Sequence, residues 1–256
     1  DGKYLAYSIS KSGSDWNEIF VMEVATRQLL PDHIEWVKFS GISWQGNGFY
    51  YSAYDRPEAG KEYSNKNEYH KVFYHRLNDQ QTQDKIVFEN KKHALRNCSA
   101  GVSEDEKFLF IVETESTSGN SVWLKDLTKA NAQAVLIAPG FDSDFSVIDH
   151  YEGKIYVLTN YQAPNQQLMV VDPARPQLKN WQTLIPESKH VIKDVSLIGG
   201  QLFVNYMQDA SNHLYAYDTS GRLLHEIELP TIGTVGISGK HDDNEAFYMF
   251  TSYTYP

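Results

Sequence analysis

A turn followed by an aromatic or aliphatic strand recurs about every 46 residues, and this period constrains the fold more than any other feature of the chain. The first apolar residue after each turn returns at intervals of 45, 59, 47, 47 and 45 residues. The long interval contains the polar stretch "DRPEAGKEYSNKNEYH", which is predicted to be a surface loop. The six recurring positions are Tyr4, Phe49, Phe108, Ile155, Leu202 and Phe247.

Each repeat contains three further strand-like runs. A second run such as "QLMVVDP" is followed by a variable run such as "KIVFE" and by a small-residue run such as "CSAGVS". Asp126, Asp172 and Asp218 end the second runs of three repeats, where an aspartate can fold back on the backbone of a tight turn. Four antiparallel strands in about 46 residues are typical of a β-propeller blade. The expected fold class is therefore all-β, with four-stranded antiparallel blades across residues 1–256.

The first strand of the pattern carries apolar residues on both faces, as Leu5, Tyr7 and Ile9 alternate with Tyr4 and Ala6. We expect such strands to be buried between stacked blades. The chain covers about five blades and begins and ends within a blade. Either its two ends pair to close a five-bladed ring, or it is part of a larger ring. The final "FTSYTYP" stops within a blade and favours the larger ring.

Composition excludes several classes of partner. The formal net charge of −10 argues against nucleic acid, because phosphates require a basic surface. No apolar run of about 18 residues is present, so no membrane span is expected. Cys98 is the single cysteine, which excludes an internal disulfide framework. A soluble protein is expected, and the choice between cytoplasm and periplasm stays open.

Motifs for catalysis are missing from the sequence. No Gly-x-Ser-x-Gly elbow occurs, and the nearest match is "GISGK" at Gly236. The nine histidines form no His-x-x-x-His pair. The segment "HDDNE" at His241 could bind a cation, but polar residues are also usual at a hairpin turn. We therefore expect no catalytic residue, metal or cofactor in this chain.

One face of the predicted propeller gathers several aromatic and charged residues. The loop "SKSGSDW" joins two strands within a blade, and "IEWVKFSG" links consecutive blades on the same face. Asp15, Trp16 and Phe39 are therefore expected to share that face, as a contact surface would require. The alternative is structural: Trp16 packs under its own loop and Phe39 packs between blades.

The segments "SGSDW", "VKFS" and "FTS…P", together with the order of the remaining strands, resemble the propeller domain of the prolyl oligopeptidase family. The resemblance runs along the whole chain. It implies a seven-bladed propeller that covers an α/β-hydrolase peptidase domain with a Ser-Asp-His triad, a domain absent from this chain. It also implies that the parent enzyme is a serine peptidase that cleaves short proline-containing peptides after proline, while the propeller excludes folded proteins.

The resemblance also implies roles for individual residues. Asp15 and Trp16 match interdomain residues that meet the peptidase domain, and Phe39 matches a residue of the pocket for the substrate residue upstream of proline. In a loop where the family often has an Arg and a Cys that contact substrate, this chain has "VETESTSGN". Glu113 and Ser116 stand at the nearest positions and are predicted as a possible substrate loop.

Two alternatives to this interpretation remain. The chain could be a stand-alone propeller that acts as a scaffold for a protein or a ligand, which a stop codon directly after it would support. It could also belong to a relative within the superfamily, such as an oligopeptidase B or a dipeptidyl peptidase. The segments "SGSDW" and "VKFS" favour prolyl oligopeptidase.

Overall fold

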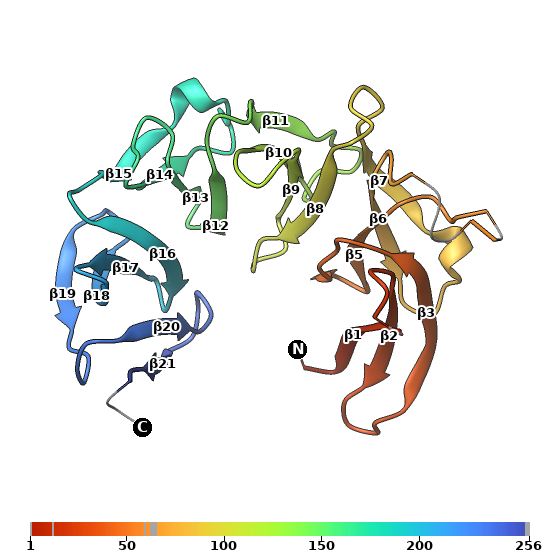
Figure 1. Cartoon of the computed structure of the whole chain (residues 1–256), viewed down its shortest axis with the longest axis horizontal. Coiled ribbons are helices and arrows are strands. Elements are labelled where there is room, and N and C mark those ends of the chain that lie inside the picture. The colour runs from red at the N-terminus through yellow and green to blue at the C-terminus, as the bar shows by residue number, and fades with distance from the viewer. Residues whose placement is uncertain (1, 12, 59, 62–65, 254–256) are drawn as a thin grey trace. The chain divides into compact units, whose positions relative to one another are not determined.

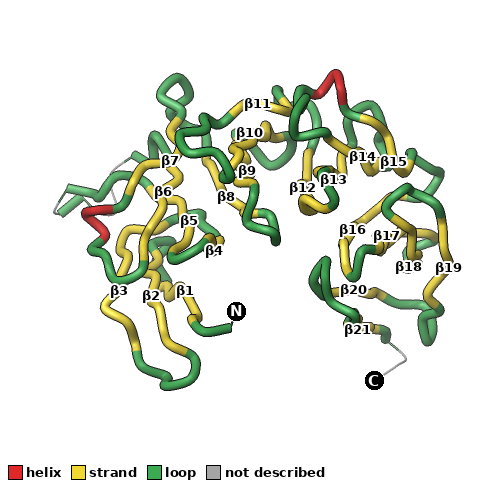
Figure 2. Tube along the Cα trace, turned by 180° about the vertical axis from the view of Figure 1, so that it is seen from behind, coloured by secondary structure: helices red, strands yellow, loops and turns green. Residues whose placement is uncertain are grey.

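The computed structural model describes residues 2–11, 13–58, 60–61 and 66–253. These residues form twenty-one β-strands and two short 3₁₀ turns, Gln81–Gln83 and Leu178–Asn180 (Figures 1 and 2). No α-helix occurs among them, and none of their helical turns approaches the length needed to cross a bilayer. The all-β prediction is confirmed. Parts of the predicted loop 55–70 and of "FTSYTYP" lie outside the described residues.

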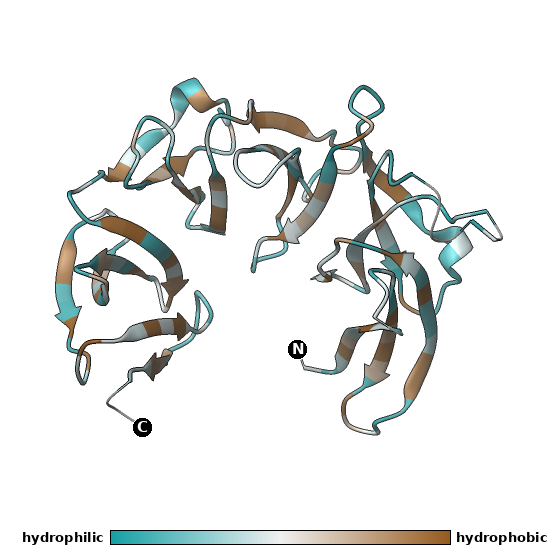
Figure 3. Ribbon diagram, viewed as in Figure 1, coloured by the Kyte–Doolittle hydropathy of each residue, from teal (hydrophilic) through white to brown (hydrophobic). Residues whose placement is uncertain are grey.

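The chain divides into two compact units, which are described separately. The first comprises Asp1–Val102, Glu106–Thr117 and Val122–Val135. The second comprises Ser103–Asp105, Ser118–Ser121 and Leu136–Pro256. In both, hydrophobic residues concentrate on the strands and the connecting loops are mainly hydrophilic (Figure 3).

The first unit opens with a seven-stranded sheet in the order β1-β2-β3-β5-β6-β7, with β4 paired to β5. Its neighbouring strands are antiparallel. The strands are β1 (Tyr4–Ser10), β2 (Asn17–Glu23), β3 (Leu29–Val37), β4 (Ser43–Gln45), β5 (Gly48–Ala53), β6 (Lys71–Arg76) and β7 (Lys85–Glu89).

The junction between the first two repeats differs from the prediction. The segment "IEWVKFSG" was expected to be a link, but its first four residues continue β3, because Ile34 and Val37 are buried in the core at 0% and 2% exposure. Val37 also pairs with Ala53 of β5. This pairing joins the first two repeats into one sheet and shortens the link to residues 38–42.

Burial on both faces is confirmed for β5 and wrong for β1. All six residues of β5 are buried, and Phe49 and Tyr51 pack in a core with Ile34. In β1, Tyr4 and Ala6 pack against this core, while Leu5 and Ile9 on the other face are 47% and 42% exposed. Within the part of the chain that the structure describes, one face of β1 therefore has no covering layer like that of β5.

The following sheet has the strand order β11-β10-β9-β8. Its strands are β8 (Asn97–Val102), β9 (Phe108–Thr114), β10 (Asn120–Asp126) and β11 (Val135–Ala138). Within the first unit, Cys98, Leu109 and Ile111 share a buried cluster with Tyr50 and Val72. Strand β9 therefore fills the role that β5 fills in the preceding sheet.

The second unit contains two four-stranded sheets, β12-β13-β14-β15 and β16-β17-β18-β19, and the pair β20-β21. Tyr156, Leu168, Ile192, Leu202 and Val204 belong to their shared core. Antiparallel pairing within each sheet confirms the predicted repeat. The strands are β12 (Phe145–Tyr151), β13 (Lys154–Thr159), β14 (Gln167–Val171), β15 (Gln182–Ile185), β16 (Val191–Ile198), β17 (Gln201–Gln208), β18 (Ser211–Asp218), β19 (Leu223–Ile227), β20 (Thr234–Ser238) and β21 (Phe247–Thr251).

The predicted aspartate turns are confirmed. The Oδ1 atoms of Asp126, Asp172 and Asp218 each accept a hydrogen bond from the backbone N–H two residues further on, at 3.0, 2.9 and 3.0 Å. This contact closes the turn that leads to the last strand of each sheet. The number of blades in a complete ring stays a prediction.

Candidate functional site

The loop between β1 and β2 presents Asp15 to solvent. The Ser10 hydroxyl donates to the Ser14 carbonyl at 2.5 Å, and the Trp16 backbone N–H donates to Ser14 Oγ at 3.0 Å. These contacts shape the loop although Ser12 lies outside the described residues. The side chain of Asp15 is 76% exposed. This exposure is compatible with the expected contact surface, and the interdomain role of Asp15 stays a prediction.

Trp16 packs against aromatic residues of its own unit. Its ring meets Trp36 edge-on, with centroids 5.6 Å apart, and meets Tyr54 edge-on at 6.5 Å. The indole is half-buried in consequence. The structural alternative for Trp16 therefore agrees with these contacts. Trp36 and Tyr54, which form this aromatic support, were not singled out from the sequence.

Lys38 connects the loop to the end of β3. Its Nζ lies 3.4 Å from Asp15 Oδ2, and its side chain is only 10% exposed. The same Nζ lies 5.1 Å from the ring centroid of Trp16 and 5.3 Å from that of Phe39. An ammonium between two aromatic rings is stabilised by both, and here it also orients the carboxylate. Lys38 lies within "VKFS", so that segment was the available sequence signal.

Phe39 is exposed rather than packed between strands. Its residue exposure is 54%, which contradicts the structural alternative for this side chain. Its φ of 51° lies in the left-handed region, as does the φ of 61° at Trp36. Bulky residues rarely adopt this conformation, and such strain clusters at functional sites. Phe39 and Asp15 line an open pocket of about 440 Å³ together with Asn17.

A buried histidine, His70, contacts the backbone of Lys38 and Cys98. His70 is 2% exposed, and its Nδ1 accepts the backbone N–H of Cys98 at 3.0 Å. Its Nε2 lies 2.9 Å from the Lys38 carbonyl oxygen, so the remaining ring N–H donates there. Burial lowers the pKa of His70 and keeps the ring neutral, which this donor and acceptor pattern requires.

The aromatic and charged cluster can bind but contains no activated nucleophile among its described residues. Cys98 Sγ lies 3.8 Å from His70 Nδ1, which resembles a cysteine–histidine pair. However, burial raises the pKa of the Cys98 thiol to about 12, and the thiol is 3% exposed. A neutral, inaccessible thiol is not a nucleophile. The arrangement of Asp15, Trp16, Lys38 and Phe39 is therefore suited to contacting another molecule.

Glu113 and Ser116, predicted as a possible substrate loop, lie in different environments. Glu113 is in β9 and is 1% exposed. Its carboxylate accepts hydrogen bonds from Asn90 Nδ2 at 2.7 Å and from Trp123 Nε1 at 2.8 Å. Ser116 is exposed in the bend that follows β9. Glu113 thus has a structural role in this arrangement, and contact of the loop with a substrate stays a prediction.

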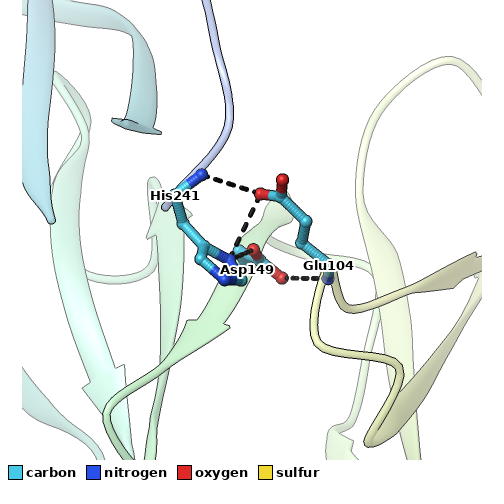
Figure 4. A group of neighbouring side chains, drawn as sticks. All are labelled: Glu104, Asp149 and His241. Carbon is cyan, nitrogen blue, oxygen red and sulfur yellow. Dashed lines mark hydrogen bonds and ion pairs between the residues drawn. The ribbon is translucent and has the colours of Figure 1, made fainter. Parts of the chain in front are cut away.

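A second cluster lies within the second unit (Figure 4). His241 Nδ1 lies 3.1 Å from Asp149 Oδ2 and 3.2 Å from Glu104 Oε2. Burial would lower the pKa of His241, but the hydrogen bond to Asp149 and the charges of Glu104, Asp149 and Asp242 raise it. The segment "HDDNE" forms a turn, as the sequence indicated. Glu104 and Asp149 are distant in sequence, so their approach to His241 was missed.

A third group, in the first unit, is fully buried. His75 Nε2 lies 2.9 Å from Asp32 Oδ1, and His75 Nδ1 lies 2.7 Å from Asp84 Oδ1. The three side chains are at most 2% exposed. Hydrogen bonds to Asp84 and Asp32 raise the pKa of His75 although burial opposes this. Because no substrate reaches a group with this burial, we assign it a structural role.

Comparison with known proteins identifies the family. The model of the prolyl oligopeptidase N-terminal β-propeller domain matches residues 1–256. The chain is 36% identical over 257 residues to a prolyl endopeptidase of Elizabethkingia meningoseptica, covering all of this chain and 36% of that protein. It is 28% identical to prolyl oligopeptidase A of Amanita bisporigera, covering 37% of that protein.

Solved structures agree with this family and extend the likeness to the fold. A structure from a study of two prolyl endopeptidases superposes with a TM-score of 0.92 at 30% identity, covering all of this chain and 37% of that one. Oligopeptidase B of Leishmania major superposes with a TM-score of 0.76, covering 98% of this chain and 36% of that one. At 19% identity, this likeness shows the fold alone. This chain thus spans little more than a third of its relatives' length. The chain belongs to the prolyl oligopeptidase family, and it corresponds to the N-terminal β-propeller domain.

Proposed function

We propose that this chain is the gating and substrate-filtering domain of a serine peptidase that cleaves short peptides after proline. The peptidase domain of the same parent chain is its partner. The family match over residues 1–256 supports this function, as do relatives named prolyl endopeptidase. The observation that carries the proposal is Phe39, an exposed aromatic ring in strained backbone beside the exposed carboxylate of Asp15.

Phe39 supplies an apolar contact to the substrate residue upstream of proline. Its exposed ring has apolar surface to bury, and complete burial of a phenylalanine is worth about 1.5–3 kcal/mol. The left-handed backbone sets the direction in which the Phe39 side chain leaves the chain. Lys38 Nζ, 5.3 Å from the ring centroid, gives the ring a neighbour on one side. A ring that is partly preorganised loses less conformational entropy on contact, which favours binding.

Asp15 and Trp16 form the part of the surface that meets the peptidase domain. Asp15 points its carboxylate to solvent, while Lys38 orients that carboxylate from a mostly buried position. A charged contact between domains shifts the balance between open and closed enzyme by its differential free energy in the two states. Closure then admits short peptides and holds them for the attack by the triad serine, with hydrolysis of the acyl-enzyme completing the reaction.

The reaction is tested with the full-length protein. The substrates are a peptide of about ten residues with one internal proline, the same peptide with alanine in place of proline, and a folded protein with an exposed proline. We expect cleavage of the proline peptide alone, at the bond after proline by mass spectrometry. Lack of cleavage would overturn the assignment and favour the stand-alone scaffold, whereas equal cleavage of the folded protein would overturn the filtering role.

The role of Phe39 is tested by substitution. Phe39→Ala in the full-length protein is expected to raise KM about tenfold for peptides with a large residue upstream of proline, because about 1.4 kcal/mol of contact is lost. Leu95→Ala is the matched control, since Leu95 is 75% exposed in the same unit. An equal change in both variants would contradict a substrate contact by Phe39.

A further inference from the structure

We propose that Glu104, Asp149 and His241 bind a zinc ion that fastens the turn between β20 and β21 to the rest of the second unit. This site is separate from the peptide-cleavage function proposed above. The three side chains converge from three segments: the turn at Ser103–Asp105, strand β12, and the turn after β20 (Figure 4). Each offers one ligand atom, and the three atoms lie within 4.8 Å of one another.

The two distances from the imidazole nitrogen fit a tetrahedral metal. His241 Nδ1 lies 3.1 Å from Asp149 Oδ2 and 3.2 Å from Glu104 Oε2. Ligand atoms at about 2.0 Å from zinc in a tetrahedron are separated by about 3.3 Å. The nitrogen therefore stands at the spacing from both oxygens that a shared ion requires. An ion enters with small movements once His241 Nδ1 is unprotonated.

The surroundings already orient each ligand. Asp149 Oδ1 accepts the backbone N–H groups of Glu104 at 2.9 Å and of His150 at 2.8 Å, which leaves Oδ2 toward His241. The backbone N–H of His241 donates to Glu104 Oε2 at 2.9 Å. Tyr151 packs on the imidazole of His241 with ring centroids 5.4 Å apart. Ligands held by outer contacts of this kind bind metal more tightly than free side chains.

The backbone carrying His241 is also fixed. The N–H of Gly200 donates to the His241 carbonyl at 2.9 Å, and the N–H of Gly199 donates to the Lys240 carbonyl at 3.0 Å. Gly199 has a φ of 56°, and an added Cβ there would lie 2.7 Å from the Asp243 carbonyl oxygen. Glycine at this position thus permits the close approach that brings His241 to the cluster.

The donor set selects the ion. One imidazole nitrogen with two carboxylate oxygens suits zinc better than calcium or magnesium, which prefer oxygen ligands alone. Two carboxylates and a neutral imidazole carry a charge of −2, which the ion balances. Three protein ligands leave the fourth position to water. The metal has a structural task here, because its three ligands come from segments far apart in the sequence and hold the turn after β20 against β12 and the turn at Ser103–Asp105.

The rival arrangement has a proton in place of the metal, with His241 as an imidazolium between two carboxylates. A direct measurement of zinc binding distinguishes the two arrangements. The full-length protein is freed of metal with a chelator, dialysed, and titrated with zinc chloride by calorimetry at pH 7.5. We expect one equivalent of tight binding in the unsubstituted protein. Binding no tighter than in the His241→Gln variant would overturn the metal site.

Variants locate the ion. His241→Gln and Asp149→Asn are expected to weaken zinc binding about 100-fold or more, since removing a ligand costs more than removing an outer contact. His213→Gln is the matched control, because His213 lies in the same unit, pairs with Glu226 at 3.2 Å and belongs to no group of three metal ligands among the described residues. Unchanged binding in His241→Gln with loss in His213→Gln would overturn the assignment.

A measurement on the unsubstituted protein keeps the test independent of variant folding. X-ray absorption of the zinc-loaded full-length protein is expected to show one imidazole nitrogen and otherwise oxygen ligands at about 2.0 Å. Two or more histidine ligands would place the ion elsewhere and overturn the proposal. Peptide cleavage by the same samples is measured separately. If no cleavage is found, the peptidase function is contradicted and the zinc measurement can still be interpreted.

Discussion

The imidazole of His70 holds the backbone of Lys38 through a hydrogen bond of 2.9 Å from Nε2 to the carbonyl oxygen. On the opposite side of the ring, Nδ1 accepts the N–H of Cys98. The exposed Phe39 directly follows Lys38 in the chain. A buried histidine therefore holds the backbone next to an exposed aromatic ring. The proposed contact surface therefore depends on the interior of the first unit.

Removing His70 should destabilise the protein. His70→Ala leaves the Cys98 N–H and the Lys38 carbonyl without their partner and creates a cavity beside Tyr54, whose ring centroid lies 4.5 Å away. We expect a loss of about 2–4 kcal/mol in the free energy of unfolding, measured by urea denaturation. His213→Ala, at a side chain 38% exposed, should change it by less than about 0.5 kcal/mol. Equal losses would show that His70 has no special role.

Asp15 and Lys38 should act as a coupled pair. Asp15→Ala is expected to lower kcat/KM for a proline peptide in the full-length enzyme, and Lys38→Met should lower it because the carboxylate loses its orientation. The double variant should lose less than the sum of the two single changes, with a coupling energy of about 0.5 kcal/mol for so exposed a carboxylate. A double-mutant cycle measures this value, and strict additivity would contradict the pairing.

The buried group at His75 should make stability depend on pH. The pKa of His75 is raised above its ordinary value of 6.5 by Asp84 and Asp32 against the opposing effect of burial. The folded state therefore binds the proton more tightly than the unfolded state. The stabilisation from this proton is fully present below about pH 6.5 and is lost as the pH rises through the folded pKa. Urea denaturation from pH 6 to pH 9 measures the loss.

The matched variant for this prediction is His75→Gln. It keeps an amide that can donate to a carboxylate but removes the titrating proton, so the decline above pH 6.5 should become shallower. We also expect a lower stability at pH 6, by about 3–5 kcal/mol, because two buried carboxylates lose a cation. If the free energy of unfolding of His75→Gln falls with pH in parallel with that of the unsubstituted protein, another group causes the loss of stability.

The turn at Asp218 should give a carboxyl with an unusually low pKa. Hydrogen bonds from Ser220 Oγ at 2.6 Å and from the Arg222 backbone N–H at 3.0 Å lower the pKa of Asp218 to about 2. A carbon-detected NMR titration measures this value directly. Ser220→Ala should raise it, while Asp172 in the corresponding turn of the preceding sheet keeps its own lowered pKa. An unchanged pKa of Asp218 in the Ser220→Ala protein would contradict the role of the hydroxyl.

Sequence periodicity predicted the fold well because each strand carries its own local signal. The turns at Asp126, Asp172 and Asp218 follow from side-chain chemistry within two residues, and the apolar run of β5 indicates burial on both faces. The extension of β3 was missed because it depends on the pairing of Val37 with Ala53, a contact between repeats.

Residues of the candidate sites could be singled out from the sequence only where a local segment carried a signal, either a resemblance to the family or the polar run "HDDNE" at His241. Asp15, Trp16 and Phe39 stand in "SGSDW" and "VKFS", but His70 supports them from 32 residues beyond Lys38 along the chain. Likewise, 45 residues separate Glu104 from Asp149, and 92 separate Asp149 from His241. Contacts over such separations depend on the packing of whole sheets, which a single sequence does not reveal.

The left-handed backbone at Phe39 implies that the most stable residue and the most active residue differ at this position, and directed evolution can measure this difference. Glycine adopts this conformation without strain, so a library screened only for heat resistance should accumulate glycine at this position. A library screened for turnover of peptides should instead retain an aromatic residue. The residue recovered at position 39 thus reports which pressure the population experienced.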